Sequence, residues 1–165
     1  MGILQALDEQ FPPLQWGASE AAVQELFPGG RQGPGAAYAV EACLVGYPYP
    51  VVLFFSFDPG LSRIEVEYPR SFDLVTGDMQ LPGRMVAESI YRHLSALLII
   101  AFGGAPRTVE DLAAADRGDT VLADHSWTTR DSAVRLEFRL QSGLGRVHVE
   151  MTERRPQAAG TRPGP

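Results

Sequence analysis

The sequence predicts an α+β protein. We expect two α-β-β-β units, the second with an extra short helix, which form an antiparallel sheet with helices packed on one face. Three observations lead to this class: a hairpin-like segment occurs twice, its strands alternate between apolar and polar residues, and a helix-like segment precedes each set of strands. We therefore expect the fold to have arisen by duplication of one unit.

The repeated segment is "LFFSFDPGLSRIEVE" at 53–67, which returns as "LEFRLQSGLGRVHVE" at 136–150. Aligning 51–68 with 134–151 needs no gap and pairs eight identical residues in eighteen, where chance would give about one. Each copy has two alternating strands around a short turn with Gly60 or Gly143, which predicts a β-hairpin. We expect both glycines to adopt the left-handed backbone conformation.

The same offset of 83 residues extends to the strand before each hairpin. It aligns "YAVEACLV" with "VLADHSWT" and places Leu44 opposite Trp127. Each half therefore predicts three antiparallel strands. Within the hairpins, Ile64 and Val66 share one face with their counterparts Val147 and Val149, because side chains alternate along a strand.

Three helices are predicted in chain order. "SEAAVQELF" at 19–27 has Ser19 as N-cap, and "RMVAESIYRHLSALLIIAF" occupies 84–102. Both end at a phenylalanine followed closely by Gly-Gly, a common C-terminal signal. "TVEDLAAAD" at 108–116 has Thr108 as N-cap and acidic residues in its first turn, and predicts the extra short helix. The end of the 84–102 segment is apolar all round, which predicts a buried central helix.

These elements divide the chain. We expect a first unit at 1–68, a linker at 69–82, a second unit at 83–153 and a disordered tail at 154–165, with the two units forming one compact domain. "GGRQGPG" at 29–35 is interpreted as a flexible connection, since it leads from a helix into a strand and phosphate loops run the opposite way.

Composition narrows the function classes. The formal charge is -6 and all fourteen basic residues are arginine, as in proteins from GC-rich bacterial genomes; this acidic balance argues against nucleic-acid binding. "MGILQALDEQFPP" has no signal-peptide pattern, and the longest apolar run, "ALLIIAF" at 96–102, is shorter than the ~20 residues of a membrane span. We expect a cytoplasmic protein with no membrane partner.

Metal and cofactor chemistry is not expected. Cys43 is the single cysteine, so no intramolecular disulfide and no CxxC motif exists. The histidines His93, His125 and His148 are far apart in sequence and lack metal-ligand spacing. The sequence therefore predicts no metal site and no cofactor.

A family resemblance follows from the helix, the sheet and the opening "WGASEAAVQELF". This pattern resembles the small modules of the outer-membrane assembly lipoprotein and β-lactamase-inhibitory-protein group, and the tandem arrangement is more similar to the inhibitory protein. The resemblance covers about residues 12 to 151 and implies that an exposed sheet binds a partner enzyme. This chain lacks the export signal and the stapling cysteines of that group, so no binding residue is carried over.

Two groups of residues invite a catalytic interpretation. Glu65 and Glu67 share one face of a strand at ~7 Å, which is compatible with a carboxylate pair. Interleaved arginine and glutamate on neighbouring strands is, however, typical of a solvated sheet face. "ADHSW" at 123–127 places an aspartate, a histidine and a serine in a row, but adjacent strand residues point to opposite faces and form no relay. We expect a protein that is not an enzyme.

The two copies differ on their outward positions. Where the second copy has Arg135, Glu137 and Arg139, the first has Val52, Phe54 and Ser56, so the first strand is apolar on both faces and needs a cover. Three covers are open: the linker at 69–82, a second copy of the chain in a homodimer, or a protein partner.

The sequence therefore favours a non-enzymatic protein-binding module, such as an inhibitor, an immunity-type protein or an adaptor, with an acidic surface that carries aromatic residues. Two alternatives stay open: a dimeric secretion-type chaperone, and a small ligand-binding protein or enzyme with a pocket between sheet and linker. The residues expected to contact a protein partner are Tyr47, Tyr49, Val52, Phe54, Arg63, Glu65, Glu67 and Phe72.

Overall fold

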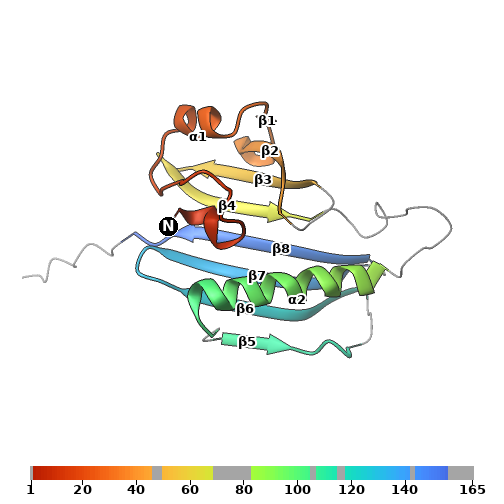
Figure 1. The fold of residues 1–165 in the computed structure, drawn as a ribbon. Helices are drawn as coiled ribbons and strands as arrows, with labels where there is room; N and C mark the ends of the chain where they lie inside the picture. Colours follow the sequence, from red (N-terminus) through yellow and green to blue (C-terminus); the bar gives the residue numbers. More distant parts are fainter. Residues whose placement is uncertain are drawn as a thin grey trace, which may run out of the picture.

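The computed structural model describes residues 2–45, 50–68, 83–104, 107–114, 118–141 and 144–155. Within these residues it contains one eight-stranded antiparallel sheet and two α-helices, so the predicted α+β class is confirmed (Figure 1). The helices are α1 (Glu20–Leu26) and α2 (Gly83–Phe102), with short 3-10 turns η1 (Ile3–Ala6) and η2 (Pro34–Ala36). The strands are β1 (Arg31–Gln32), β2 (Tyr38–Cys43), β3 (Pro50–Phe57), β4 (Leu61–Glu67), β5 (Arg107–Glu110), β6 (Asp119–Thr128), β7 (Ser132–Gln141) and β8 (Leu144–Glu153).

The strand order is β1-β2-β3-β4-β8-β7-β6-β5, so two four-stranded meanders meet where β4 pairs with β8. Val66 lies directly opposite Val149 at this junction. Leu53 pairs with Val66 in the first hairpin, and adding 83 to both numbers gives the pair of Leu136 with Val149 in the second. The two hairpins therefore have the same register.

The strand before each hairpin does not keep the predicted offset. Leu53 pairs with Val40, whereas Leu136 pairs with His125, so β6 is displaced by two further residues. Trp127 consequently takes the place of Ala42, and not of Leu44 as predicted. The reason is a shorter connection: residues 44–49 separate the paired ends of β2 and β3, but only 129–132 separate those of β6 and β7. A shift of two residues keeps every side chain on its face.

The two helices predicted at 19–27 and 84–102 are present as α1 and α2. Ser19 caps α1, because its hydroxyl accepts a hydrogen bond from the Ala22 N–H at 3.2 Å. After α2, Gly103 has a positive φ of 86° and donates its N–H to the Ile99 carbonyl at 2.8 Å. The Gly-Gly pair therefore ends α2 as the sequence indicates, whereas α1 already leaves the helical conformation at Phe27, before its Gly-Gly pair.

The prediction that α2 is enclosed is wrong for its last two turns. Leu94 and Leu98 are buried and contribute to the core, but Ile99 is 41% exposed and Ile100 is 82% exposed. Helix α2 contacts β7 and β8 on one side, which leaves these isoleucines on the other. The stretch Arg84–Phe102 has a mean hydropathy of 1.4 and meets the length and composition criterion for a membrane span, a criterion that the core helix of a soluble protein also meets.

The extra helix predicted at 108–116 is also wrong over the residues described. Arg107–Glu110 forms β5, which pairs with Ala123 to Ser126 of β6. Thr108 and Val109 are β-branched residues that favour a strand when an open sheet edge is available. The second half therefore has a fourth strand in place of a helix. In the first half, "GGRQGPG" contains β1 and the start of η2, so this connection includes regular structure that was not predicted.

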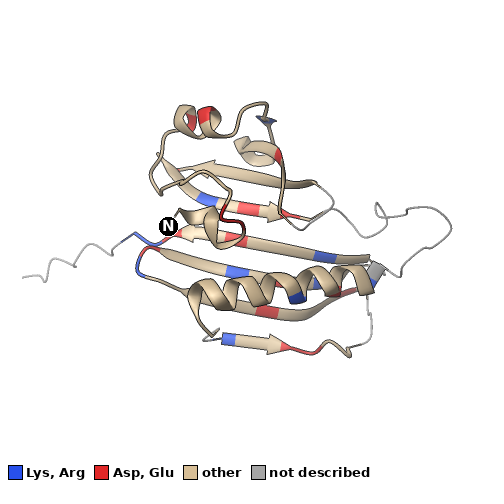
Figure 2. Cartoon of the chain, viewed as in Figure 1, with Lys and Arg blue, Asp and Glu red and all other residues tan. Residues whose placement is uncertain are grey.

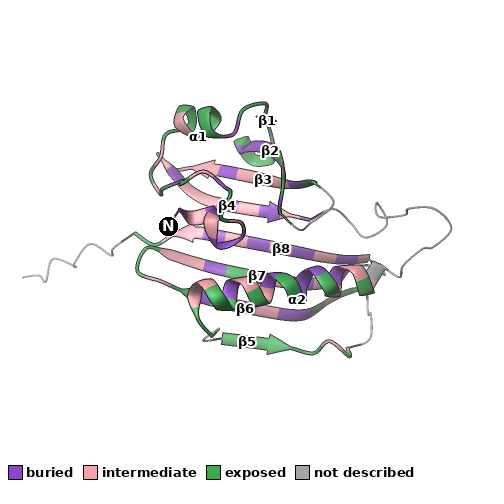
Figure 3. Cartoon of the chain, in the orientation of Figure 1, coloured by how far each residue is buried: buried purple, intermediate pink, exposed green. Residues whose placement is uncertain are grey.

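The core lies against one face of the sheet. Residues that point to this face, such as Leu53, Phe55 and Val149, are fully buried together with side chains from η1, α1 and α2. Figure 3 shows buried residues alternating with less buried ones along the central strands. The predicted common face of Ile64, Val66 and their counterparts is confirmed.

Gly60 does not adopt the expected left-handed conformation. A Cβ at this position would overlap the carbonyl group of Gly17, and the two segments are joined by the hydrogen bond from Gly17 N–H to the Leu61 carbonyl at 2.9 Å. Close approach of two backbones therefore requires this glycine. Gly143, the predicted linker at 69–82 and the tail after Arg155 lie outside the described residues.

Candidate protein-binding face

Alternate residues of β3, β4, β6, β7 and β8 project away from the core, and we call the surface they form the open face. Figure 2 shows charged residues distributed along β4, β6, β7 and β8, while β3 carries none. The side chains that form the open face are those of Val52, Phe54, Arg63, Glu65, Glu67, Asp124, Arg135, Glu137, Arg139, Arg146, His148 and Glu150.

Five of the predicted contact residues come together on this face. Val52 pairs with Glu67, and Phe54 pairs with Glu65, across β3 and β4. Arg63 lies one position further along and pairs with Ser56. Two apolar side chains thus lie directly beside two carboxylates. The other three predicted residues, Tyr47, Tyr49 and Phe72, lie outside the described residues.

The chain itself covers part of Phe54. Gly33, between β1 and η2, lies so near that a Cβ on it would be 3.2 Å from the Phe54 ring and 3.1 Å from the Ala39 side chain. Phe54 is half-buried beside this segment, and Val52 is half-buried as well. None of the three predicted covers includes this segment. The glycines of "GGRQGPG" were the available signal, because a backbone without side chains can pack closely on an aromatic ring.

The carboxylates at the centre of the open face are paired with cations. Arg63 Nε lies 2.8 Å from Glu150 Oε1, and Arg146 Nη2 lies 3.6 Å from Glu67 Oε1. Glu65 Oε1 lies 3.0 Å from the Arg63 guanidinium and 3.3 Å from His148 Nε2. This arrangement fits the interpretation of a solvated face with cross-strand ion pairs. It does not favour a catalytic carboxylate pair.

The second half of the open face is a more tightly paired network. Arg135 donates two hydrogen bonds to Asp124, at 2.9 and 2.7 Å, and a third to Glu137 at 2.9 Å. The hydrogen bonds between Arg135 and Asp124 raise the pKa of the arginine and lower the pKa of the carboxyl group. Arg139 bonds to Glu137 and to Asp119, both at 2.9 Å. Few charges in this half are left for a partner.

A second polar cluster lies on the core side, where α2, β5 and β6 meet. The Tyr91 hydroxyl donates to Glu110 Oε2 at 2.7 Å and is also within hydrogen-bond reach of His125 Nε2. His125 is only 6% exposed and stacks on Trp127, with ring centroids 5.8 Å apart. Burial and the hydrogen bond to Glu110 raise the pKa of Tyr91, and the same hydrogen bond lowers the pKa of Glu110.

Sequence reasoning missed this cluster. It correctly placed Asp124 and His125 on opposite faces, but Glu110 was assigned to a helix, and no local pattern connects it with Tyr91. The hydrogen bond from Tyr91 to Glu110 connects α2 with the outer strand β5. No group of three or more histidine, cysteine or acidic side chains that could hold a metal ion exists within the described ranges.

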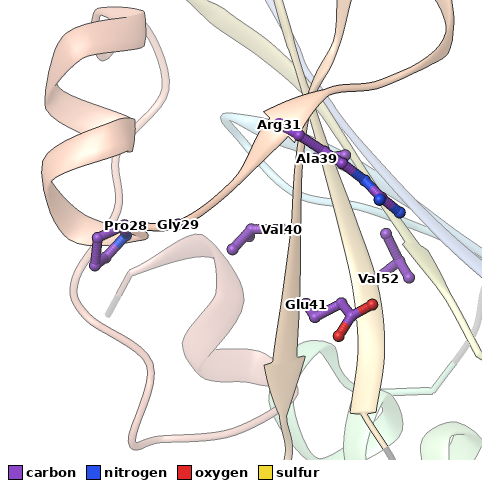
Figure 4. A pocket seen from close by; sticks show the side chains of 7 residues that line it. All are labelled: Pro28, Gly29, Arg31, Ala39, Val40, Glu41 and Val52. Atoms are coloured by element: carbon purple, nitrogen blue, oxygen red, sulfur yellow. The ribbon is translucent and has the colours of Figure 1, made fainter.

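A hollow of about 220 Å³ lies at the β1 end of the sheet (Figure 4). Figure 4 shows the Arg31 side chain extending past Ala39 towards Val52, with the Glu41 carboxylate on the neighbouring strand. The residues that line the hollow are Pro28, Gly29, Arg31, Ala39, Val40, Glu41 and Val52. The hollow therefore joins the apolar part of the open face to the outer edge of β2.

Comparison with known proteins identifies no relative: no family model, no curated protein and no solved structure matches the chain. The resemblance to the inhibitory-protein group therefore stays a prediction.

Proposed function

We propose that the chain is a non-enzymatic protein-binding module that presents its open face to a protein partner. The observation that carries this proposal is the direct pairing of Val52 and Phe54 with Glu67 and Glu65. An apolar patch with a charged border is the usual composition of a protein interface, in which a few large side chains contribute most of the binding free energy.

We also infer that the two halves are duplicated units and that the helices pack on one face of the sheet. The equal registers of the two hairpins and the position of Val66 opposite Val149 support the duplication, because a local two-fold axis at that pair would exchange the halves. The shared core of η1, α1, α2 and the inward strand residues supports the second inference. Such an arrangement leaves the open face available for a partner.

The charges around the patch indicate the chemistry of the partner. Glu41, Glu65 and Glu67 surround Val52 and Phe54. The described part of the chain places Arg63 beside Glu65 and Arg146 beside Glu67, and the Arg31 side chain extends towards Val52 (Figure 4). No ion pair of Glu41 is found within the described ranges. A partner with an aromatic or aliphatic centre flanked by lysine or arginine fits this border, and opposite charges would also speed the encounter.

To test this proposal, we choose substitutions in the first half that the equivalent strand positions of the second half indicate will fold. Val52→Arg introduces the residue type that the second half carries at the equivalent position, and Phe54→Thr introduces a good strand former without placing a carboxylate opposite Glu65. We expect the wild-type chain to form a stoichiometric complex with one protein from lysate of the source cells. The double variant should bind that purified protein at least ~30-fold more weakly.

The matched control is Val109→Arg on β5, an exposed valine at the other end of the sheet, which should bind as the wild type does. Circular dichroism would show that both variants are folded. Unchanged affinity of the folded double variant would contradict the proposal. A wild-type chain that runs as a homodimer in light scattering and binds unfolded segments would favour the chaperone alternative.

A further inference from the structure

The two outer strands of the sheet, β1 and β5, pair with different lengths of their neighbouring strands. In the second half, β5 pairs with four residues of β6, from Ala123 to Ser126. In the first half, β1 pairs only with Ala39 and Tyr38 of the six-residue strand β2. Beyond Ala39, the side of β2 that faces away from β3 has no strand partner in the part of the chain that the structure describes.

The second half indicates what fits beside this edge. Val40 and His125 occupy equivalent positions, since they pair with Leu53 and Leu136. Glu41 is then equivalent to Ser126. In the second half, Thr108 and Arg107 of β5 lie opposite His125 and Ser126. The corresponding place beside Val40 and Glu41 is the hollow of about 220 Å³ in Figure 4. An extended strand is therefore the kind of segment that this position accepts.

The backbone of β2 is oriented to receive such a strand. The Gly33 N–H donates to the Ala37 carbonyl at 2.7 Å, which shows that Ala37 turns its peptide groups towards β1. In an antiparallel ladder, alternate residues turn their N–H and C=O groups to the same neighbour. Ala39, Glu41 and Cys43 therefore direct theirs to the β1 side. Glu41 and Cys43 lie past the end of β1, so their groups form a template for a further strand.

We propose that an extended peptide segment of a protein partner adds to the edge of β2 beside Val40–Cys43, antiparallel to it and in line with β1. The segment carries a basic residue opposite Glu41, because a cation opposite this exposed carboxylate gives a favourable cross-strand pair. The apolar side chains on either side of this basic residue point to the other face of the sheet, beside Val40, which also lines the hollow. This inference rests on the proposed function, since it names the form in which the partner contacts the module.

The single cysteine gives a direct probe of this edge. Cys43 is exposed, and a small trifluoroethylthio tag on it reports its surroundings by fluorine NMR. The ligands are two capped peptides, Thr-Val-Arg-Val-Thr and its matched control Thr-Val-Glu-Val-Thr. We expect a saturable fluorine shift with the arginine peptide and about 10-fold weaker binding of the glutamate peptide, because the charge opposite Glu41 is reversed.

Two variants test the backbone and the charge separately. Glu41→Pro removes one N–H that points to the edge and leaves the N–H groups of Val40 and Ala42 for β3, so binding of both peptides should be lost. Glu41→Arg should reverse the preference between the two peptides. Glu25→Arg, an exposed glutamate on α1, is the matched control and should change neither affinity.

Four outcomes would overturn the proposal. The first is the absence of a saturable fluorine shift with both peptides, and the second is that folded Glu41→Pro binds the peptides as well as the wild type does. The third is peptide binding only after residues 69–82 are replaced by a Gly-Ser linker. The fourth is a tag signal that changes on dilution as a dimer dissociates. The third outcome would assign the edge to the chain's own linker, and the fourth to a second copy. If the peptides do not bind but Val52→Arg/Phe54→Thr loses its partner, the proposal for the β2 edge is wrong and the open-face proposal stands. If the peptides bind but the double variant keeps its partner, the open-face proposal is wrong.

Discussion

The halves β1–β4 and β5–β8 share a hairpin register but differ on the open face. Positions that carry Arg135 and Glu137 in the second half carry Val52 and Phe54 in the first, with the same pairing to the next strand. The core sides remain alike, since Phe55 and Phe138 are both fully buried. The comparison shows that the inward side chains are alike in the two halves, whereas the outward side chains differ.

The outer strands differ in how they are held. In the first half, the Tyr38 hydroxyl donates to the Phe27 carbonyl at 2.6 Å and accepts the Gly30 N–H at 2.9 Å, so its hydrogen-bond partners among the described residues are backbone groups. In the second half, the Tyr91 hydroxyl meets the titratable side chains Glu110 and His125. Attachment of β5 should therefore depend on pH through these side chains.

The largest expected effect tests whether the halves form one cooperative unit. Phe55→Ala and Phe138→Ala remove equivalent, fully buried rings that pack on Phe27 and on Tyr91. Each should lower the free energy of unfolding by about 3–5 kcal/mol through lost burial and a residual cavity. Urea unfolding followed by circular dichroism and tryptophan fluorescence should give one transition in both variants. Two separate transitions, with only one shifted, would show that the halves are independent domains.

A smaller effect concerns the tyrosines at the two edges. Tyr91→Phe should lower the free energy of unfolding at neutral pH by about 1–2 kcal/mol, because a buried hydrogen bond is lost. The raised pKa of Tyr91 means that the folded state favours the neutral phenol. Its contribution to stability is therefore complete below about pH 10 and is lost as the pH rises further. Urea midpoints of the wild type should fall in this range, and those of Tyr91→Phe should fall less.

Tyr38→Phe is the matched control for this prediction, since it removes a hydroxyl bonded to backbone groups. It keeps Tyr91, so the part of the alkaline loss of stability that comes from Tyr91 should remain. An equal flattening of the pH dependence in both variants would mean that the two edges respond alike and that the contrast between them is wrong.

The smallest effect concerns the open face itself. Val52→Arg places a cation between Glu41 and Glu67, its neighbours in the register on either side. Two exposed cross-strand ion pairs would offset the lost burial of the valine, so the free energy of unfolding should stay within about 0.5 kcal/mol of the wild type. Val52→Glu should be less stable, because it sets like charges opposite each other. Thermal unfolding at low and high salt would show both effects; a large loss in Val52→Arg would indicate that this position is packed as core.

Much of the architecture could be predicted from residues close together in the chain. The alternation in 53–67 and 136–150 identified the hairpins and the two faces of the sheet, and Ser19 and Gly103 marked helix ends. Five of the eight predicted contact residues lie together on the open face, because period-two alternation places them there. The Tyr91, Glu110 and His125 cluster could not be predicted, since nothing local connects its three segments.

The sequence by itself determined the six strands β2, β3, β4, β6, β7 and β8 and which of their side chains face the core, because these properties depend on short-range periodicity. The tertiary structure decided which strands are neighbours: the junction of β4 with β8, the outer strands β1 and β5, and the packing of Gly33 on Phe54. These contacts join residues far apart in the chain. Residues such as Thr108 and Val109, whose local pattern also allows a helix, form a strand because they pair with the edge of the sheet.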